Sequence, residues 1–310
     1  MSTAALFDRY GTPEELYTTE IPVPSPGYGE VLVRYTAIGV NPIDWKILRG
    51  DLRTQLPLAF PGCLGVEAAG VVVETGAGVR RFSVGDAVIR HGRPGTYRIH
   101  EVVPASQEAD ELTAMPARFS AEQAAVLPVA AGTAYSALRQ VGLRAGERLL
   151  VHGASGGVGL ATVQLALLMG AAEVIGTASP RHHELLFRLG ATPVEYGSGL
   201  PERLAAFGTM DASVDCAGGP QPTVATVRLV DRPARRVTIV PDPEAHAQDV
   251  PFVEHVPLEL ASTLDLIGHS AFELPISARF PLSRAAEALA LSQKGGSGGK
   301  IVLLPDGIPQ

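Results

Sequence analysis

Residues 148–169 read RLLVHGASGGVGLATVQLALLM, and this stretch decides the fold of the chain around it. The apolar run 148–152 is followed at once by the glycine turn, residues 153–159, and then by an apolar segment. A strand, a tight turn and a helix in direct succession are the context of a dinucleotide-binding fingerprint. The strict pattern G-x-G-x-x-G would begin at Ala154, so the match is A-x-G-x-x-G. We therefore predict dinucleotide binding, with a tight turn that holds no ligand as the alternative.

Strands and helices alternate on the C-terminal side of the glycine turn. The pattern predicts a helix over 157–169, a strand at 173–177 and a helix over 181–189. Further strands are expected at 212–215 and 236–240. This βαβ rhythm is typical of a doubly wound parallel sheet.

The first 120 residues have a different texture. Short apolar runs at 30–34, 69–74 and 86–90 are separated by proline and glycine turns. Such spacing favours a small β-sandwich or barrel. Near the C-terminus we expect an amphipathic helix over 283–293 and a final strand over 300–304.

Composition and charge exclude several classes of protein. The 310 residues suit two domains, and 46% hydrophobic with 18% charged residues rules out disorder for most of the chain. A net charge of −7 argues against nucleic acid as the main partner. Two cysteines, Cys63 and Cys216, cannot form a disulfide framework.

Residues 149–172 carry no charge, but glycines and Gln164 interrupt them, so we expect no membrane span. The first ten residues lack a signal-peptide pattern, which predicts a cytoplasmic protein.

The second predicted strand of the alternating region indicates which dinucleotide binds. An enzyme that uses NAD usually has an acidic residue about 20 positions after the turn, for the ribose 2′-hydroxyl. This chain has Ser179 and Arg181 there and no acid. A hydroxyl and a guanidinium bind a 2′-phosphate, which a carboxylate would repel. We therefore predict NADP(H), with a solvated Arg181 as the alternative.

Many short segments of the chain match one family in order and spacing. They are GVNPIDWK at 39–46 with Arg49 and Gly50, LGVEAAGVV at 64–72, FSVGDAV at 82–88, AAVLPVAAGTAY at 124–135, the glycine turn, LGA at 189–191, Tyr196 and GKIVL at 299–303. On these segments the chain resembles the medium-chain dehydrogenase/reductase (MDR) superfamily, specifically its zinc-independent quinone oxidoreductase-like branch. The resemblance covers nearly the whole sequence.

The resemblance implies an α/β fold of two domains. Residues 1–126 and 278–310 would form a GroES-like, partly open β-barrel domain that carries substrate and catalysis. Residues 127–277 would form a Rossmann domain, a doubly wound parallel sheet, for NADP(H). A homodimer is expected, because relatives commonly join nucleotide-domain sheets edge to edge.

The resemblance also allows the zinc positions of the superfamily to be compared one by one. Catalytic zinc needs three protein ligands and an open position. The first ligand, a cysteine, corresponds to Asn41, and Val66 stands at the histidine of the family's Gly-His-Glu. Cys63 is close in sequence but is not an equivalent residue. We therefore expect no zinc and no oxidation of primary alcohols.

Without zinc, the acceptor of the hydride must need only modest polarisation. A quinone or the C=C bond of an α,β-unsaturated carbonyl compound meets that condition. Lys46, one of only three lysines, is the predicted donor to the developing oxyanion. A solvent-facing lysine, or one that contacts a cofactor phosphate, is the alternative. By resemblance, Asn41 and Asp44 lie beside the nicotinamide, although Asp44 could simply cap or anchor its loop.

The remaining candidate residues are assigned to the cofactor. Thr133 resembles a hinge residue that contacts it, and Tyr196 an aromatic residue at the adenosine end, although an exposed strand-end tyrosine explains Tyr196 equally well. Gly298 and Gly299 either approach the cofactor or form the turn before the last strand. The full predicted set is Asn41, Thr133, Ala154, Ser155, Gly156, Gly157, Val158, Gly159, Thr177, Ser179, Arg181, Tyr196, Gly298 and Gly299.

The sequence leaves three functional hypotheses open. The first is a general NADPH-dependent quinone or enone reductase. The second is a biosynthetic tailoring reductase with one dedicated substrate, and the third is an NADPH-binding structural or regulatory protein with little turnover. The segment 241–257 is rich in proline and acidic residues and differs from the family expectation, so we expect it to shape the substrate site.

Overall fold

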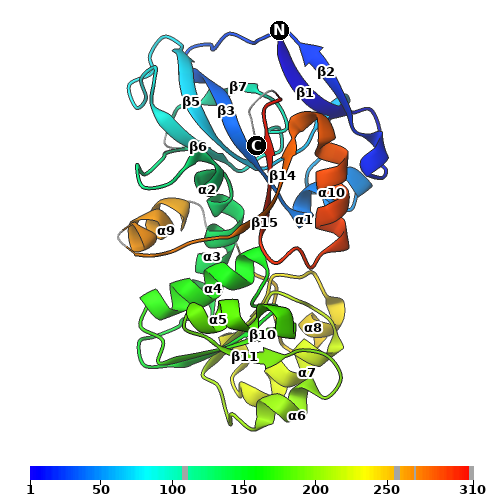
Figure 1. Ribbon diagram of the computed structural model, residues 1–310, viewed down its shortest axis with the longest axis vertical. Coiled ribbons are helices and arrows are strands. Elements are labelled where there is room, and N and C mark those ends of the chain that lie inside the picture. Colours follow the sequence, from blue (N-terminus) through cyan, green and yellow to red (C-terminus); the bar gives the residue numbers. More distant parts are fainter. Residues whose placement is uncertain (107–110, 255–258, 269, 307–310) are drawn as a thin grey trace. The chain divides into compact units, whose positions relative to one another are not determined.

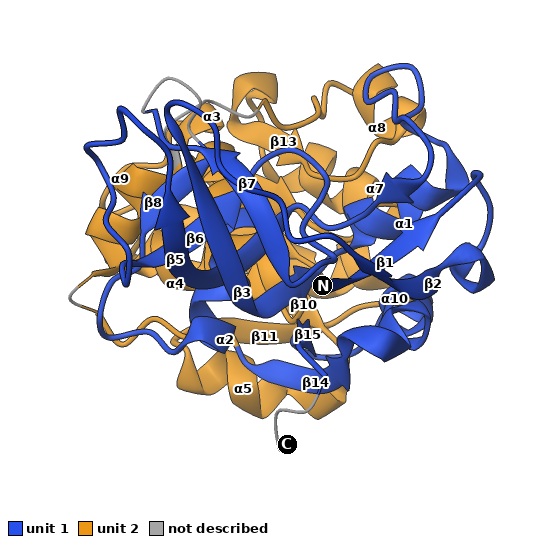
Figure 2. Ribbon diagram, turned by 90° about the horizontal axis from the view of Figure 1, so that it is seen from above, with its two compact units in different colours: residues 1–129, 275–310 blue, residues 130–274 orange. Residues whose placement is uncertain are grey.

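The computed structural model describes residues 1–106, 111–254, 259–268 and 270–306 (Figure 1). The chain divides into two compact units: unit 1 is residues 1–129 with 275–310, and unit 2 is residues 130–274 (Figure 2). Unit 1 thus takes its residues from both ends of the chain. Which unit binds substrate and which binds cofactor stays a prediction.

Unit 1 is built on two β-sheets. The larger sheet has the order β14-β15-β3-β5-β6-β8, with β7 also paired to β3, and the smaller has the order β2-β1-β4. Apart from the parallel pair β14 and β15, neighbouring strands are antiparallel. The strands are β1 (Ser2–Phe7), β2 (Tyr17–Ile21), β3 (Glu30–Val40), β4 (Gly62–Cys63), β5 (Glu67–Thr75), β6 (Ala87–His91), β7 (His100–Pro104), β8 (Leu112–Ala114), β14 (Ile276–Pro281) and β15 (Lys300–Leu304).

Strand β3 brings distant parts of the sequence together at one end of the larger sheet. Its last residue, Val40, pairs with Ile301 of β15, and Ile38 pairs with Ala68 of β5. The residue after β3 and the first residues of β5 and β15 therefore lie at the same end of three neighbouring strands. These residues are Asn41, Glu67 and Lys300.

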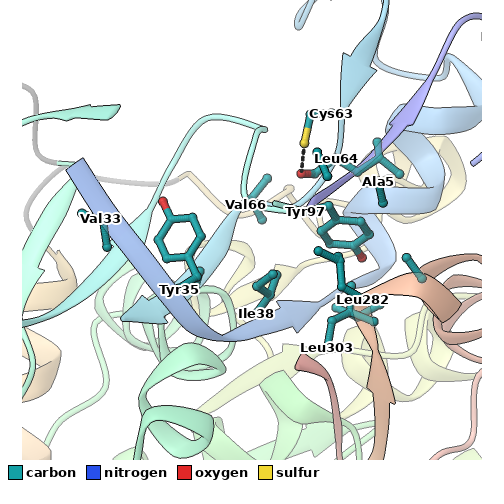
Figure 3. Close-up of a cluster of buried hydrophobic side chains, with 14 of the residues drawn as sticks. Ala5, Val33, Tyr35, Ile38, Cys63, Leu64, Val66, Tyr97, Leu282 and Leu303 are labelled. Atoms are coloured by element: carbon teal, nitrogen blue, oxygen red, sulfur yellow. Dashed lines mark hydrogen bonds between the residues drawn. The ribbon is translucent and has the colours of Figure 1, made fainter. Parts of the chain in front are cut away.

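A buried apolar cluster supports this end of the sheet. Figure 3 shows Tyr35 and Ile38 of β3 in the cluster with Val66, Tyr97 and Leu303. All five side chains are buried. Because interiors are close-packed, such a cluster holds the strand ends in fixed positions.

The helices of unit 1 include one that the sequence patterns did not predict. Residues expected to form a loop after β3 form helix α1 (Pro42–Arg49). Pro42 at the first position, Asp44 in the first turn and Gly50 at a φ of +84° after the last turn are ordinary start and stop signals. The other helical segments are η1 (Pro13–Glu15), α2 (Ala121–Ala125), η5 (Leu282–Arg284) and α10 (Ala285–Lys294), while the π-helical η2 (Pro128–Gly132) runs across the unit boundary.

Unit 2 contains one fully parallel sheet of order β11-β10-β9-β12-β13, flanked by helices. The strands are β9 (Arg148–His152), β10 (Glu173–Ala178), β11 (Thr192–Glu195), β12 (Ala212–Asp215) and β13 (Arg236–Thr238). The helical segments are α3 (Thr133–Gln140), α4 (Gly157–Leu168), η3 (Pro180–His182), α5 (His183–Arg188), α6 (Leu200–Ala205), α7 (Pro220–Leu229), η4 (Pro233–Arg235), α8 (Pro243–Ala247) and α9 (Glu259–Ile267). The predicted doubly wound parallel sheet is confirmed.

Helix α4 is apolar and buried along most of its length, which explains the uncharged run in the sequence. Its one long polar side chain, Gln164, donates to the carbonyl of Glu273 at 2.8 Å and accepts from the Glu273 N–H at 3.0 Å. Among the helices that the structure describes, none is long and apolar enough to cross a membrane.

The segment 241–257 is described only in part. It contains the short helix α8 and, at Phe252, a single bridge to Thr238 at the end of β13. Residues 255–257 lie outside the described residues. Its expected effect on the substrate site stays a prediction.

Candidate functional site

The glycine turn leads from β9 directly into α4. Its glycines have no side chains, which allows the backbone at the start of α4 to lie against the backbone at the end of β9. A Cβ atom at Gly159 would lie 2.3 Å from the carbonyl oxygen of Gly153, so only glycine fits there. Gly153 has a φ of +65°, and the Gly156 N–H donates to its carbonyl at 3.0 Å. The chain therefore turns tightly and starts the helix within a few residues.

The N-terminus of α4 has the chemistry of an anion site. The helix has 12 residues, and its first N–H groups have no partner within the helix. These groups belong to Gly157, Val158 and Gly159, next to the exposed Gly156 and the half-buried Ser155. The helix dipole adds positive potential at the same place. A dinucleotide pyrophosphate fits this turn, since a glycine allows its close approach.

Two predicted cofactor residues hold the turn in place through the neighbouring strand. The buried Ala154 donates its N–H to the Thr177 carbonyl at 2.9 Å. The hydroxyl of Thr177, at the end of β10, accepts from the Gly153 N–H at 3.2 Å. In this structure Ala154 and Thr177 thus support the turn.

The segment after β10 carries the predicted 2′-phosphate residues. Ser179 precedes the 3₁₀ helix η3 and is half-buried, and Arg181 is exposed within η3. The Arg181 Nε donates to the His182 ring at 3.1 Å. The first acidic residue after β10 is Glu184, which lies inside α5. The chain thus carries no acidic residue between the end of β10 and α5, while Glu195, the exposed last residue of β11, pairs with Ala178 at that end.

A polar group that the sequence patterns did not indicate lies beneath the glycine turn. His152 ends β9 and is fully buried, and burial lowers its pKa to about 4. Asp215 ends β12 beside it and accepts from the N–H groups of Ala217 and Gly218, each at 2.9 Å. Their positions in the sequence could have indicated them. Both residues are polar and end a buried parallel strand, and ligands bind at the carboxyl ends of such strands.

The structure places the other cofactor candidates at separate positions. In unit 2, Thr133 is buried as the first residue of α3, and Tyr196 follows β11 with 59% of its surface exposed. In unit 1, Gly298 has a φ of +67° in the turn before β15. A Cβ at Gly299 would lie 2.5 Å from the Pro275 carbonyl oxygen, so this glycine is needed for packing.

Unit 1 contains a buried polar cluster around Asn41. Its amide nitrogen donates to Glu67 Oε1 at 2.7 Å, and its amide oxygen accepts from the ammonium of Lys300. The same ammonium donates to Glu67 Oε1 at 3.0 Å. We call these three side chains the Asn41 ring. Lys300 and Glu67 were not among the predicted site residues.

Asp44 holds the backbone of Asn41 from the first turn of α1. Its Oδ2 accepts from the Asn41 N–H at 2.8 Å and from the Tyr97 hydroxyl at 3.1 Å. Its Oδ1 is buried without a hydrogen-bond partner among the described residues. Burial raises the pKa of this carboxyl to about 7, and the nearby Glu67 adds to the effect. Asp44 thus caps the helix, as one of the two hypotheses held, and it can carry a proton near neutral pH.

Lys46 lies on the same helix but faces elsewhere. Side chains two positions apart on a helix do not share a face, so Lys46 points away from the side of Asp44. Its ammonium lies 5.5 Å from the centre of the Trp45 ring, and partial burial lowers its pKa. Arg49 packs on the same ring at 4.9 Å. The structure therefore brings Asn41 and Asp44 together and leaves Lys46 separate.

The donor set around Asn41 does not fit a catalytic zinc. Val66 presents a buried carbon side chain, and the amide of Asn41 is occupied by Lys300 and Glu67. The thiol of Cys63 is buried and donates to the Gly95 carbonyl at 3.3 Å. In the ranges that the structure describes, no three His, Cys, Asp or Glu side chains are grouped as metal ligands.

The sequence matches known families over most of its length. Residues 27–115 match the alcohol dehydrogenase GroES-like domain, and residues 189–303 match a domain described as zinc-binding dehydrogenase. The chloroplastic quinone-oxidoreductase QR1 of Triphysaria versicolor is 32% identical over 97% of this chain and 98% of its own length.

Solved structures share the fold across nearly the whole chain. An NAD-dependent alcohol dehydrogenase has a TM-score of 0.85 at 26% identity, covering 98% of this chain and 99% of its own. A mycobacterial protein complexed with NADPH has a TM-score of 0.81 at 26% identity, covering 98% of this chain and 100% of its own. The predicted α/β fold, a GroES-like domain with a Rossmann-like parallel sheet, is thereby confirmed. The chain belongs to the medium-chain dehydrogenase/reductase superfamily and is an NAD(P)-dependent oxidoreductase of its quinone oxidoreductase-like branch.

Proposed function

We propose that this protein is a zinc-free, NADPH-dependent reductase. It transfers a hydride to a quinone or to the C=C bond of an α,β-unsaturated carbonyl compound. The observation that carries the proposal is the Asn41 ring, because the amide that stands at one zinc-ligand position is hydrogen-bonded to an ammonium and a carboxylate. Such a site suits acceptors whose negative charge spreads over a conjugated system.

Preference for NADPH rests on the end of β10. Structural neighbours include both an NAD-dependent enzyme and an NADPH complex, so the fold by itself does not choose between the two cofactors. Ser179 and Arg181 offer a hydroxyl and a fixed positive charge to a 2′-phosphate. The segment between β10 and α5 holds no acid before Glu184, and the exposed Glu195 belongs to the neighbouring strand β11.

The residues of this chain take complementary roles in the proposed reaction. When bound, NADPH supplies the hydride. The glycine turn binds its pyrophosphate through the N–H groups of α4. In unit 1, Asn41 orients the reacting groups. The ammonium of Lys46 lies on another face of α1, against Trp45, and its proposed role is to donate to the oxygen on which negative charge develops. Asp44, with a pKa of about 7, holds Asn41 and stores a proton beside it.

The test is oxidation of NADPH and of NADH with a panel of quinones, linear enones and cyclic enones. We expect turnover with NADPH and at least one of these classes, unchanged by a chelator and with no stoichiometric zinc by elemental analysis. Zinc that is lost together with activity would refute the zinc-free site. Tight NADPH binding without oxidation by any acceptor would favour a structural or regulatory NADPH binder. The cytoplasmic location and the homodimer stay predictions, and sizing by light scattering checks the latter.

A further inference from the structure

The amide of Asn41 is fixed from both sides by charged groups from distant parts of the chain. Lys300 donates to its oxygen, and its nitrogen donates to Glu67. A lysine ammonium only donates hydrogen bonds, and a carboxylate only accepts them. If the amide were rotated by 180°, its NH₂ group would face the Lys300 ammonium and its oxygen would face the Glu67 carboxylate. The ring therefore permits one orientation of the Asn41 side chain.

The carboxylate in the ring is itself held in place. Its second oxygen, Oε2, accepts from the Val129 N–H at 2.8 Å. The neighbouring strand makes room for it, because a Cβ at Gly39 would lie 2.3 Å from Glu67 Oε1 and 2.7 Å from the Ala125 carbonyl oxygen. Glu67 thus has little freedom to move away from Asn41.

Local structure does not require this ring. Asp44 already holds the Asn41 N–H at the start of α1, without any contact from Lys300 or Glu67. A buried ion pair is costly to desolvate, and apolar residues of similar volume often give equal stability. Glu67 is 0% and Lys300 6% exposed, so the cost applies here. What the ring adds is the direction of one amide.

We propose that Lys300 and Glu67 are positioning residues, which act on the reaction by orienting the amide of Asn41. This inference rests on the proposed function. An amide nitrogen has two hydrogens, and Glu67 takes one of them. On this proposal the other N–H, held in a single direction, donates to a carbonyl oxygen of either the nicotinamide or the substrate. Binding and turnover measurements separate these two sources.

The decisive variant combines Glu67→Gln with Lys300→Met. In this double variant the Val129 N–H still requires an acceptor, so the side-chain oxygen of the new Gln takes the place of Glu67 Oε2. The NH₂ group of the Gln then faces Asn41. The Asn41 amide must then turn over to accept from it, and no ammonium opposes the turn. Both charges are removed together, so no unpaired charge is left in the interior. The variant should fold with its side-chain amide reversed.

We expect this double variant to melt within a few degrees of the wild type and to lose about 10-fold or more in kcat/KM. If Asn41 faces the nicotinamide, NADPH affinity in a fluorescence titration falls as well. If it faces the substrate, NADPH affinity is unchanged and the loss lies in turnover. Lys300→Arg keeps a pure donor and should retain more activity than the double variant.

The matched control is Arg90→Met, which removes another buried cation from unit 1. Arg90 is 2% exposed, and its ion pairs are with Glu101 and Glu111, which are not members of the Asn41 ring. It should lower the melting temperature and leave kcat/KM of the folded protein close to the wild-type value.

Two results separate failure of this inference from failure of the proposed function. A double variant with normal melting, normal NADPH affinity and wild-type kcat/KM would overturn the positioning role. A loss in Arg90→Met equal to that in the double variant would do the same, since general loosening would then explain both. A wild-type protein that oxidises NADPH with none of the acceptors would instead refute the proposed function.

Discussion

The glycine turn of unit 2 and the Asn41 ring of unit 1 are built by opposite means. The turn is one continuous stretch, and it works because side chains are missing: a Cβ at Gly159 would meet backbone at 2.3 Å. The ring joins residues from three strand ends, 41, 67 and 300, and it works by charge and hydrogen bonding. Substitutions in the turn should therefore act through steric fit, and those near the ring through protonation and amide orientation.

The largest combined effect on stability and cofactor binding is expected at Gly159. Gly159→Ala forces backbone apart at the start of α4, so it should cost about 1–3 kcal/mol of stability, as overpacking does. The N–H groups of the turn move with it, and NADPH affinity should fall at least ~10-fold. Thermal melting and fluorescence titration measure the two effects.

Gly156→Ala is the matched control for that variant. Its Cβ would meet only the Gly153 carbonyl oxygen, at 3.4 Å, so stability should be nearly unchanged while the close approach of a phosphate is hindered. Equal destabilisation by the two substitutions would contradict a steric role specific to Gly159.

The second prediction concerns Asp44 and pH. An aspartate in an unfolded chain has a pKa near 3.9, whereas burial raises that of Asp44 to about 7. The folded protein therefore binds an extra proton between these values, and the stability this gives is lost as the pH rises through about 7. Asp44→Asn mimics the protonated acid, so above pH 8 it should be more stable than the wild type by roughly 2–4 kcal/mol, at about 1.4 kcal/mol per pKa unit.

Denaturant unfolding at pH 5 and pH 8.5 checks the effect, which should shrink at the lower pH to roughly a third, because pH 5 is only about one unit above the unfolded pKa. Asp51→Asn is the control, because Asp51 is exposed and Arg49 lowers its pKa instead. That variant should differ little from the wild type at both pH values. If Asp44→Asn is less stable than the wild type at pH 8.5, the carboxylate is ionised and stabilising there, and the assignment is wrong.

The same contrast explains what the sequence could predict. The turn, β9 and β12 were predicted with their observed bounds, because local apolar runs and glycines determine them. The Asn41 ring was not predicted as a unit, since Lys300 and Glu67 meet Asn41 only through the pairing of β15 and β5 with β3. Helix α1 was not predicted, because it has only eight residues and the segment was interpreted as a loop. Pro42 and Gly50 are nevertheless residues typical of a helix start and a helix end.

The third prediction asks whether catalysis in unit 1 needs a charge outside the ring. Lys46→Met removes the ammonium and keeps most of the stem, so packing on Trp45 should survive. If Lys46 stabilises the developing oxyanion, kcat should fall about 10-fold to 10²-fold with little change in KM. Steady-state kinetics with one quinone and one enone measure this.

The control for Lys46 is Arg49→Met. It removes a neighbouring cation that packs on the same aromatic side chain, Trp45. It should leave kcat unchanged. Lower NADPH affinity with normal saturated turnover in Lys46→Met would instead make this lysine a phosphate contact.

The smallest predicted effect returns to unit 2 and tests whether charge matters there at all. Arg181 is exposed after β10, so its interaction with a 2′-phosphate is screened by water and salt. We expect the wild type to bind NADPH about 10-fold more tightly than NADH, near 1.4 kcal/mol. Arg181→Ala should remove most of that preference by lowering the affinity for NADPH and leaving the affinity for NADH unchanged, because NADH has no 2′-phosphate.

The control is Arg188→Ala, which replaces an exposed arginine on α5 and should change neither affinity. Raising the salt concentration should shrink the wild-type preference and leave the variant unchanged, since only the former depends on a surface charge pair. Equal affinity of the wild type for the two cofactors would show that the missing acid after β10 does not select NADPH, and the glycine turn would then bind dinucleotides by shape alone.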